Sequence, residues 1–129
     1  MSAGPVTLSR LRVAVEAGWD ERTAYQGALR PGNPAFGQCY PTARIVQHFF
    51  PDLEIACGEV DTGAGLETHF WNVRVGDDGI EHVDLSWRQF PPDSIIVGYR
   101  LLDRDALGDT APTLARCALL LERVIRRLG

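Results

Sequence analysis

The sequence predicts an α+β domain in which helices pack against a small antiparallel sheet. Helical patterns occupy much of the first fifty residues, strand-like segments follow between residues 53 and 102, and a last helical pattern starts near residue 113. Strands that follow one another without intervening helices favour an antiparallel meander over a parallel sheet. The 129 residues fit one domain, residues 1–129, which is long enough to bury a core without disulfides.

The expected elements, in chain order, are a helix at residues 8–17, a helix that follows Cys39 and ends at Pro51, strands at 53–60, 68–75, 80–86 and 95–102, and a helix at 113–128. Thr7 or Ser9 can cap the first helix, and Gly18 can stop it. Two prolines make residues 30–36 irregular. The second helix places Ala43 and Val46 on one apolar face.

The predicted strands are separated by clear turn signals. The glycine-rich residues 61–65 are expected to form a loop. Residues 76–79, Gly-Asp-Asp-Gly, lie between two strand patterns and predict a β-hairpin. The last predicted strand follows two prolines at positions 91 and 92.

Composition and charge exclude several classes of partner. The chain is 45% apolar and 23% charged with a net charge of −4, so we expect binding to neither nucleic acid nor an anionic membrane. No stretch approaches the roughly 18 apolar residues of a membrane span. Residues 1–15 contain two arginines and no apolar signal-peptide core, so a cytoplasmic location is expected. Three cysteines in such a chain do not suggest a disulfide framework.

Cys39 is the candidate nucleophile. It lies in the segment Phe-Gly-Gln-Cys-Tyr-Pro, residues 36–41, at the expected start of a helix. The unpaired N–H groups and the positive dipole end of a helix favour the thiolate, which is the nucleophilic form of cysteine. Gly37 permits a sharp turn before the helix, and Pro41 is tolerated in its first turn. Cys57 and Cys117 lie in apolar runs and are expected to be inert buried residues.

The predicted hairpin brings a histidine and a carboxylate to one face. If its turn is centred on residues 77 and 78, facing residue numbers sum to about 155, so Trp71 opposes Asp84 and His69 opposes Ser86. His69 and Asp84 are then diagonal neighbours within hydrogen-bonding reach. A carboxylate that orients an imidazole is the third member that a Cys–His pair needs. The thiol meets this histidine if the nucleophile helix packs on the same face.

Two other roles compete with this triad: His82 as the base, and zinc binding. His82 lies on the same face as His69 and is a rival base, but it is nearer the turn. Cys39, His69, His82 and Asp84 could in principle ligate zinc, but the spacings contain no C-x-x-C or H-x-x-x-H pattern. We therefore expect no metal site and no cofactor.

An acyl-transfer site also needs hydrogen-bond donors for the developing oxyanion. The backbone N–H of Cys39 is one candidate donor. Gln38, next to the nucleophile, and Asn33, six residues before it, are the side-chain candidates. Trp71 and Trp87 are expected to wall the substrate cleft, whereas Asn72 points to the opposite face of its strand and is expected to be structural.

Several short blocks of the sequence, taken together, resemble a known family. They are Asn-Pro-Ala-Phe-Gly-Gln-Cys at 33–39, Thr-Ala at 42–43, His-Phe-Trp-Asn at 69–72, Asp-Leu-Ser at 84–86 and Gln-Phe at 89–90. These blocks resemble the YunG-like family of small bacterial proteins, which is distantly similar to papain-like and transglutaminase-like cysteine enzymes. The resemblance implies a minimal papain-like fold with Cys39 as nucleophile, His69 as base and Asp84 as orienting group. It implies no substrate.

The sequence thus predicts a cysteine-dependent enzyme that transfers an acyl group from an amide, ester or thioester through an acyl-enzyme. Water as acceptor gives a hydrolase, and an amine as acceptor gives an amide-forming transferase. The expected partner is a small acyl or peptide-like substrate, and a protein partner that completes the site is left open. The alternative is a non-catalytic binding or regulatory module on the same fold.

Overall fold

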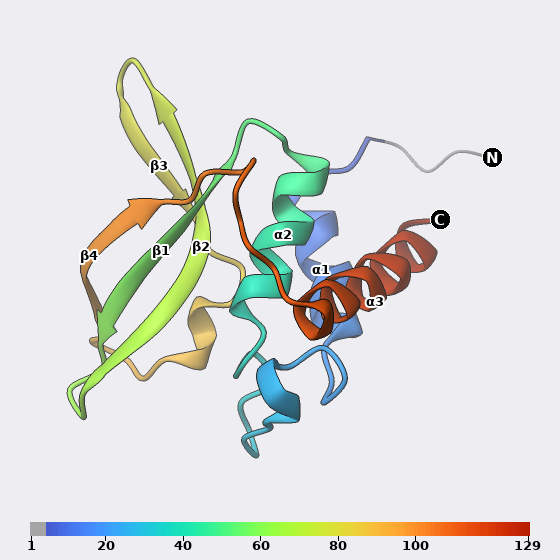
Figure 1. Ribbon diagram of the computed structural model, residues 1–129, viewed down its shortest axis with the longest axis horizontal. Coiled ribbons are helices and arrows are strands. Elements are labelled where there is room, and N and C mark those ends of the chain that lie inside the picture. Colours follow the sequence, from blue (N-terminus) through green and yellow to red (C-terminus); the bar gives the residue numbers. More distant parts are fainter. Residues whose placement is uncertain (1–4) are drawn as a thin grey trace.

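A computed structural model, which describes residues 5–129, shows an α+β domain with a curled antiparallel sheet on one side and the helices on the other (Figure 1). The described elements are α1 (Leu8–Gly18), η1 (Tyr25–Gly27), α2 (Cys39–Phe49), β1 (Glu54–Asp61), β2 (Leu66–Gly76), β3 (Gly79–Val83), η2 (Trp87–Gln89), β4 (Ile95–Leu101) and α3 (Ala111–Leu128), where η marks a 3₁₀ turn. Residues 1–4, part of the segment expected to lack a signal peptide, lie outside the described residues. Among residues 5–129, no helix combines the length and the hydropathy of a membrane span.

The helix ends follow the capping signals of the sequence. Thr7, one of the two expected caps, accepts a hydrogen bond from the N–H of Arg10 at 3.2 Å, and α1 begins after it. α3 begins at Ala111, two residues earlier than expected. Thr110 caps this helix, and Pro112 fits within its first turn, where a missing N–H costs nothing.

The sheet has the strand order β3-β2-β1-β4, and every neighbouring pair is antiparallel. The β2–β3 hairpin pairs Asn72 with Val83 and Gly76 with Gly79, which confirms the register predicted from the turn. β3 ends at Val83 instead of residue 86, so Asp84 lies just beyond the ladder. The part of β2 before Asn72 therefore has no strand on its β3 side within the described chain.

α2 covers the sheet face opposite to the one that carries His69. The side-chain amide of Asn72 donates to the backbone carbonyl of Ala43 in α2 at 3.0 Å. The rings of Tyr40 and Phe70 meet edge-on with centroids 4.8 Å apart. Phe70 and Asn72 alternate with His69 along β2 and point to the other face. The condition under which the thiol was expected to meet His69, packing of α2 on the histidine face, is therefore not met, whereas the structural role expected for Asn72 is confirmed.

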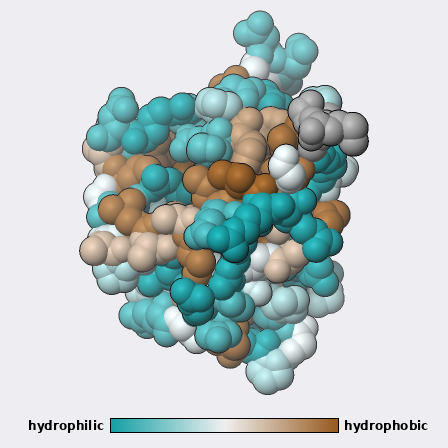
Figure 2. Space-filling view, turned by 90° about the vertical axis from the view of Figure 1, so that its right-hand side faces the viewer, coloured by the Kyte–Doolittle hydropathy of each residue, from teal (hydrophilic) through white to brown (hydrophobic). Residues whose placement is uncertain are grey.

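The main core lies between the helices and this face of the sheet. Its buried members are Leu11, Ala14, Val15, Ile45, Val46, Leu53, Val83, Leu85, Leu120 and Val124. Removal of these apolar side chains from water is the main stabilising contribution to the fold. The side on which α1 and α3 lie shows mostly hydrophilic residues with hydrophobic ones between them (Figure 2).

A second, smaller cluster of Ala56, Trp71 and Val73 lies on the His69 face of the sheet. The Trp71 ring lies directly over Gly58. A Cβ atom at Gly58 would come within 2.7 Å of Trp71 Cη2 and 2.4 Å of a backbone carbonyl oxygen of β4. No side chain fits in this space, so the glycine is what lets the indole approach the sheet.

Candidate functional site

His69 and Asp84 form a short hydrogen-bonded pair, as the hairpin register predicts. His69 Nε2 lies 2.6 Å from Asp84 Oδ2, a short contact of the kind that charge-assisted hydrogen bonds make. The other carboxylate oxygen, Oδ1, accepts from the backbone N–H of Ser86 at 3.1 Å and from its hydroxyl at 3.4 Å. Both oxygens are therefore engaged. The turn after β3 fixes the carboxylate, and the carboxylate fixes the imidazole.

The imidazole of His69 is fully buried among aromatic rings. Trp71 stacks on it with centroids 5.5 Å apart, while Trp87 and Phe90 contact it edge-on at 6.0 and 4.7 Å. Trp71 is only 1% exposed, so it supports the histidine from inside the protein. Trp87 begins η2 and Phe90 directly follows it; both are half-buried, so these two rings, and not Trp71, are the aromatic walls with accessible surface.

Cys39 is the first residue of α2 and is half-buried. Gln38 precedes it without a side-chain cap, and Pro41 has no N–H, so the N–H groups of Cys39 and Tyr40 have no partner within the helix. The Cys39 side chain lies close enough to the His69 ring to raise the pKa of that ring. Because Nε2 is held by the carboxylate, Nδ1 is the ring nitrogen left for the thiol.

The electrostatics of the site favour an imidazolium. Burial acts to lower the pKa of His69, but hydrogen bonds and charge attraction from Asp84 and Cys39 outweigh it and raise this pKa from 6.5 to about 9. His69 is therefore protonated at neutral pH, and a cation beside the cysteine is the partner that nucleophilic thiol chemistry uses. The other two thiols are harder to ionise than an ordinary thiol. Burial raises the pKa of Cys57, and it raises the pKa of Cys117 to about 11.

The two side chains expected to donate to an oxyanion are both engaged elsewhere. Gln38 is fully buried, its Nε2 donates to the carbonyl of Asp20 at 3.0 Å, and its Oε1 accepts from the Thr23 hydroxyl at 2.8 Å. Asn33 donates through Nδ2 to the backbone carbonyl of Gln89 at 2.7 Å. Both amides thus hold loops in place around the start of α2.

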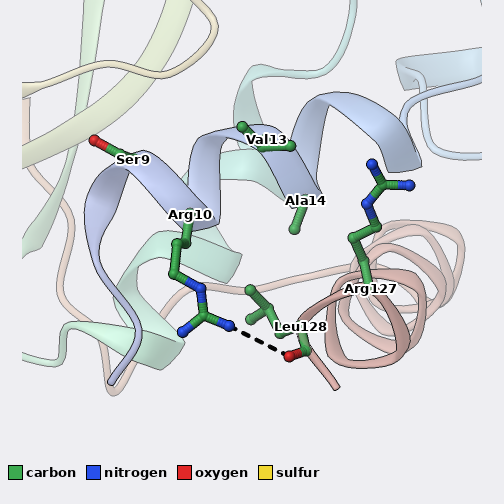
Figure 3. A pocket seen from close by; sticks show the side chains of 6 residues that line it. All are labelled: Ser9, Arg10, Val13, Ala14, Arg127 and Leu128. Atoms are coloured by element: carbon green, nitrogen blue, oxygen red, sulfur yellow. Dashed lines mark hydrogen bonds between the residues drawn. The ribbon is translucent and has the colours of Figure 1, made fainter. Parts of the chain in front are cut away.

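His82, the rival base, lies on the predicted face but is paired with a different residue. Its Nδ1 accepts a hydrogen bond from Trp71 Nε1 at 2.9 Å. No three His, Cys, Asp or Glu side chains of residues 5–129 are grouped closely enough to hold a metal ion. A shallow pocket of about 380 Å³ lies between α1 and the end of α3, where Arg10 donates to the carbonyl of Leu128 (Figure 3). No residue of the Cys39 site lines that pocket.

Gln89 lies in the site although no role was predicted for it. Its Nε2 is 3.5 Å from His69 Nδ1 and donates to the backbone carbonyl of Ser86 at 3.1 Å. The available signal was its place in the Gln-Phe block, five residues after Asp84. A sequence pattern alone does not show that the η2 turn brings this amide back to the histidine.

The comparison with known families covers nearly the whole described chain. The model of the family described as YunG protein matches residues 7–129, from the cap of α1 to the end of α3. No curated protein and no solved structure matches the chain.

Proposed function

This chain belongs to the YunG family, and we propose that it is a cysteine-dependent acyl-transfer enzyme of minimal papain-like type. The observation that carries the proposal is the 2.6 Å contact between His69 Nε2 and Asp84 Oδ2, made by an imidazole whose other nitrogen is left for Cys39. A nucleophile, a base within reach of it and a third group that orients the base are the parts that nucleophilic catalysis needs. The proposed location is the cytoplasm.

The first half of the proposed reaction forms an acyl-enzyme. In the starting ion pair, Nδ1 of His69 carries the proton of the Cys39 thiol, while Nε2–H donates to Asp84. The thiolate adds to the carbonyl carbon of an amide, ester or thioester and gives a tetrahedral oxyanion. The backbone N–H of Cys39 at the start of α2 supports that negative charge. When the intermediate collapses, the Nδ1 proton passes to the leaving group, and the acyl group stays on sulfur as a thioester.

In the second half of the proposed reaction, His69 acts as the base toward the acyl acceptor. Neutral His69 takes a proton from water or from an amine through Nδ1, and the resulting nucleophile attacks the thioester. Collapse of the second tetrahedral intermediate returns the thiolate of Cys39 and leaves the imidazolium beside it. Water releases a carboxylic acid, and an amine releases an amide.

The proposed substrate is a small acyl or peptide-like group with little charge. Trp87 and Phe90 offer half-buried apolar surface next to His69, where the acyl group would lie. Trp71 is excluded from this contact by its burial, so its proposed role changes from cleft wall to support of the base.

The proposal predicts that iodoacetamide at pH 6 alkylates Cys39 and leaves Cys57 and Cys117 unmodified. An ordinary thiol with a pKa of roughly 8.5 is under about 1% ionised at this pH, whereas Cys39 lies at a helix start beside a protonated His69. Burial raises the pKa of each of the other two thiols. Peptide mapping after brief labelling of the folded protein measures the three sites separately.

Asp84→Asn adds a pH-dependent control to this labelling. Loss of the carboxylate lowers the pKa of His69, so the imidazolium is lost at lower pH than in the wild type. The difference in labelling between the two proteins should therefore grow as the pH rises from 6 toward 9. Equal labelling of all three cysteines, or an unmodified Cys39, would instead support a non-catalytic binding or regulatory module.

A further inference from the structure

We infer that Gln89 is the side-chain donor of the oxyanion hole, an inference that rests on the proposed acyl-transfer function. The geometric observation is the placement of its amide, whose Nε2 lies 3.5 Å from His69 Nδ1. Nδ1 is the ring nitrogen left for the Cys39 sulfur. An amide this close to Nδ1 lies beside the position at which a carbonyl carbon bonds to that sulfur.

Gln89 is held in this position by four hydrogen bonds, three of which come from its own turn. Its backbone N–H and its side-chain Nε2 both donate to the carbonyl of Ser86, each at 3.1 Å, and Nε2 also lies 3.4 Å from the Ser86 hydroxyl. Its backbone carbonyl accepts the 2.7 Å hydrogen bond from Asn33. Ser86 also binds the Asp84 carboxylate, so one short segment positions both the orienting carboxylate and this amide. Such preorganisation is what an oxyanion donor requires.

One of the two hydrogens on the Gln89 side-chain amide is not used by Ser86. The NH₂ group carries two hydrogens, and Ser86 takes one of them, shared between its carbonyl at 3.1 Å and its hydroxyl at 3.4 Å. The other is directed toward His69. Nδ1 of a protonated His69 is itself a donor and cannot accept this second N–H, so the hydrogen is free to bind the negative oxygen that forms during acyl transfer.

The other amides near Cys39 do not offer this combination. Gln38 Nε2 is bound to Asp20 within the protein, and its side chain is fully buried. Asn33 donates to the backbone of Gln89, which makes it a positioning residue for the donor. The side-chain donor of the oxyanion hole is therefore Gln89, which follows Asp84 in the chain. The second donor is the backbone N–H of Cys39.

In the proposed step, the Cys39 thiolate forms the carbon–sulfur bond, and the π electrons of the carbonyl move onto its oxygen. That oxyanion accepts hydrogen bonds from Gln89 Nε2 and from the Cys39 N–H. Collapse restores the carbonyl, breaks the bond to the leaving group and transfers the His69 Nδ1 proton to it. Gln89 binds the oxyanion and exchanges no proton, so its loss affects acylation but not simple alkylation of the thiol.

The test measures two reactions of Cys39 in Gln89→Ala and in the wild type. Acylation by p-nitrophenyl acetate passes through an oxyanion and is expected to slow by roughly 10²–10³-fold. Alkylation by iodoacetamide forms no oxyanion and should stay within about threefold of the wild type. Gln47→Ala is the matched control, because Gln47 also donates an amide hydrogen bond to a backbone carbonyl, that of Leu53 at 3.1 Å, at the far end of α2.

Gln89→Met provides a second variant if alanine impairs folding, since methionine keeps the length of the side chain but has no N–H. Loss of acylation with alkylation retained in either folded variant supports the inference. A wild-type acylation rate in a folded Gln89 variant, or equal loss of both reactions, overturns the inference alone. If the wild type is alkylated at Cys39 but accepts no acyl group from any ester or thioester, the proposed function falls, and this role of Gln89 falls with it.

Discussion

Replacement of His69 by alanine is expected to slow the acylation of Cys39 by roughly 10²–10⁴-fold, the usual contribution of a positioned general acid–base group. The substitution removes the proposed base of the reaction and, with it, the protonated ring that lies beside Cys39. The measurement is the rate of p-nitrophenol release from p-nitrophenyl acetate during the first turnover. Circular dichroism should accompany it, because the His69 side chain is fully buried.

His48→Ala is the matched control for this experiment, since His48 is an exposed histidine near the end of α2. It should acylate at the wild-type rate. His82→Ala tests the rival base directly. If folded His69→Ala retains wild-type acylation while His82→Ala loses it, the assignment of the base is wrong. In that case the 2.6 Å contact between His69 and Asp84 would be structural only.

Gly58→Ala is expected to lower the free energy of unfolding by about 1–3 kcal/mol, the usual cost of overpacking a filled site. The new Cβ would lie 2.4 Å from the carbonyl oxygen of Gly98 and 2.7 Å from Trp71 Cη2, so the backbone or the indole must move. Since Trp71 stacks on His69, acylation should fall together with stability. Urea denaturation measures the free energy of unfolding.

Gly98→Ala is the control within the same pair of strands. A Cβ at Gly98 meets no atom within 4 Å, so this variant is expected to change stability by no more than about 0.5 kcal/mol. Equal stability of Gly58→Ala and the wild type would show that the space above Gly58 is not filled by the indole. The support that Trp71 gives to His69 would then need another explanation.

The sequence was sufficient to predict the hairpin because its information is local. A Gly-Asp-Asp-Gly turn fixes the register of two strands, and the period of two along a strand fixes which residues share a face. The pairing of Asn72 with Val83 and the contact of His69 with Asp84 follow from these two rules. The start of α2 at Cys39 is local in the same sense, because a turn and Pro41 define it.

Contacts between distant elements could not be predicted in this way. Strand alternation shows that His69 and Asn72 face opposite sides, but it does not show which side a helix covers. α2 covers the Asn72 side, and its first turn approaches His69 where β2 has no β3 partner. The part played by Gln89 was missed for the same reason. It depends on the path of η2, a turn set by tertiary hydrogen bonds to Ser86 and Asn33.

The most direct test of the central claim is trapping the acyl-enzyme on Cys39. The protein is incubated with p-nitrophenyl acetate, quenched with acid and examined by intact-mass spectrometry and peptide mapping. The chain contains no lysine, so background acylation of side-chain amines does not obscure the result. We expect one acetyl group, located on Cys39, that is absent from Cys39→Ala. A protein that gains no acyl group from any ester or thioester, or that carries it on another residue, would contradict the assignment of Cys39, His69 and Asp84 as a catalytic triad.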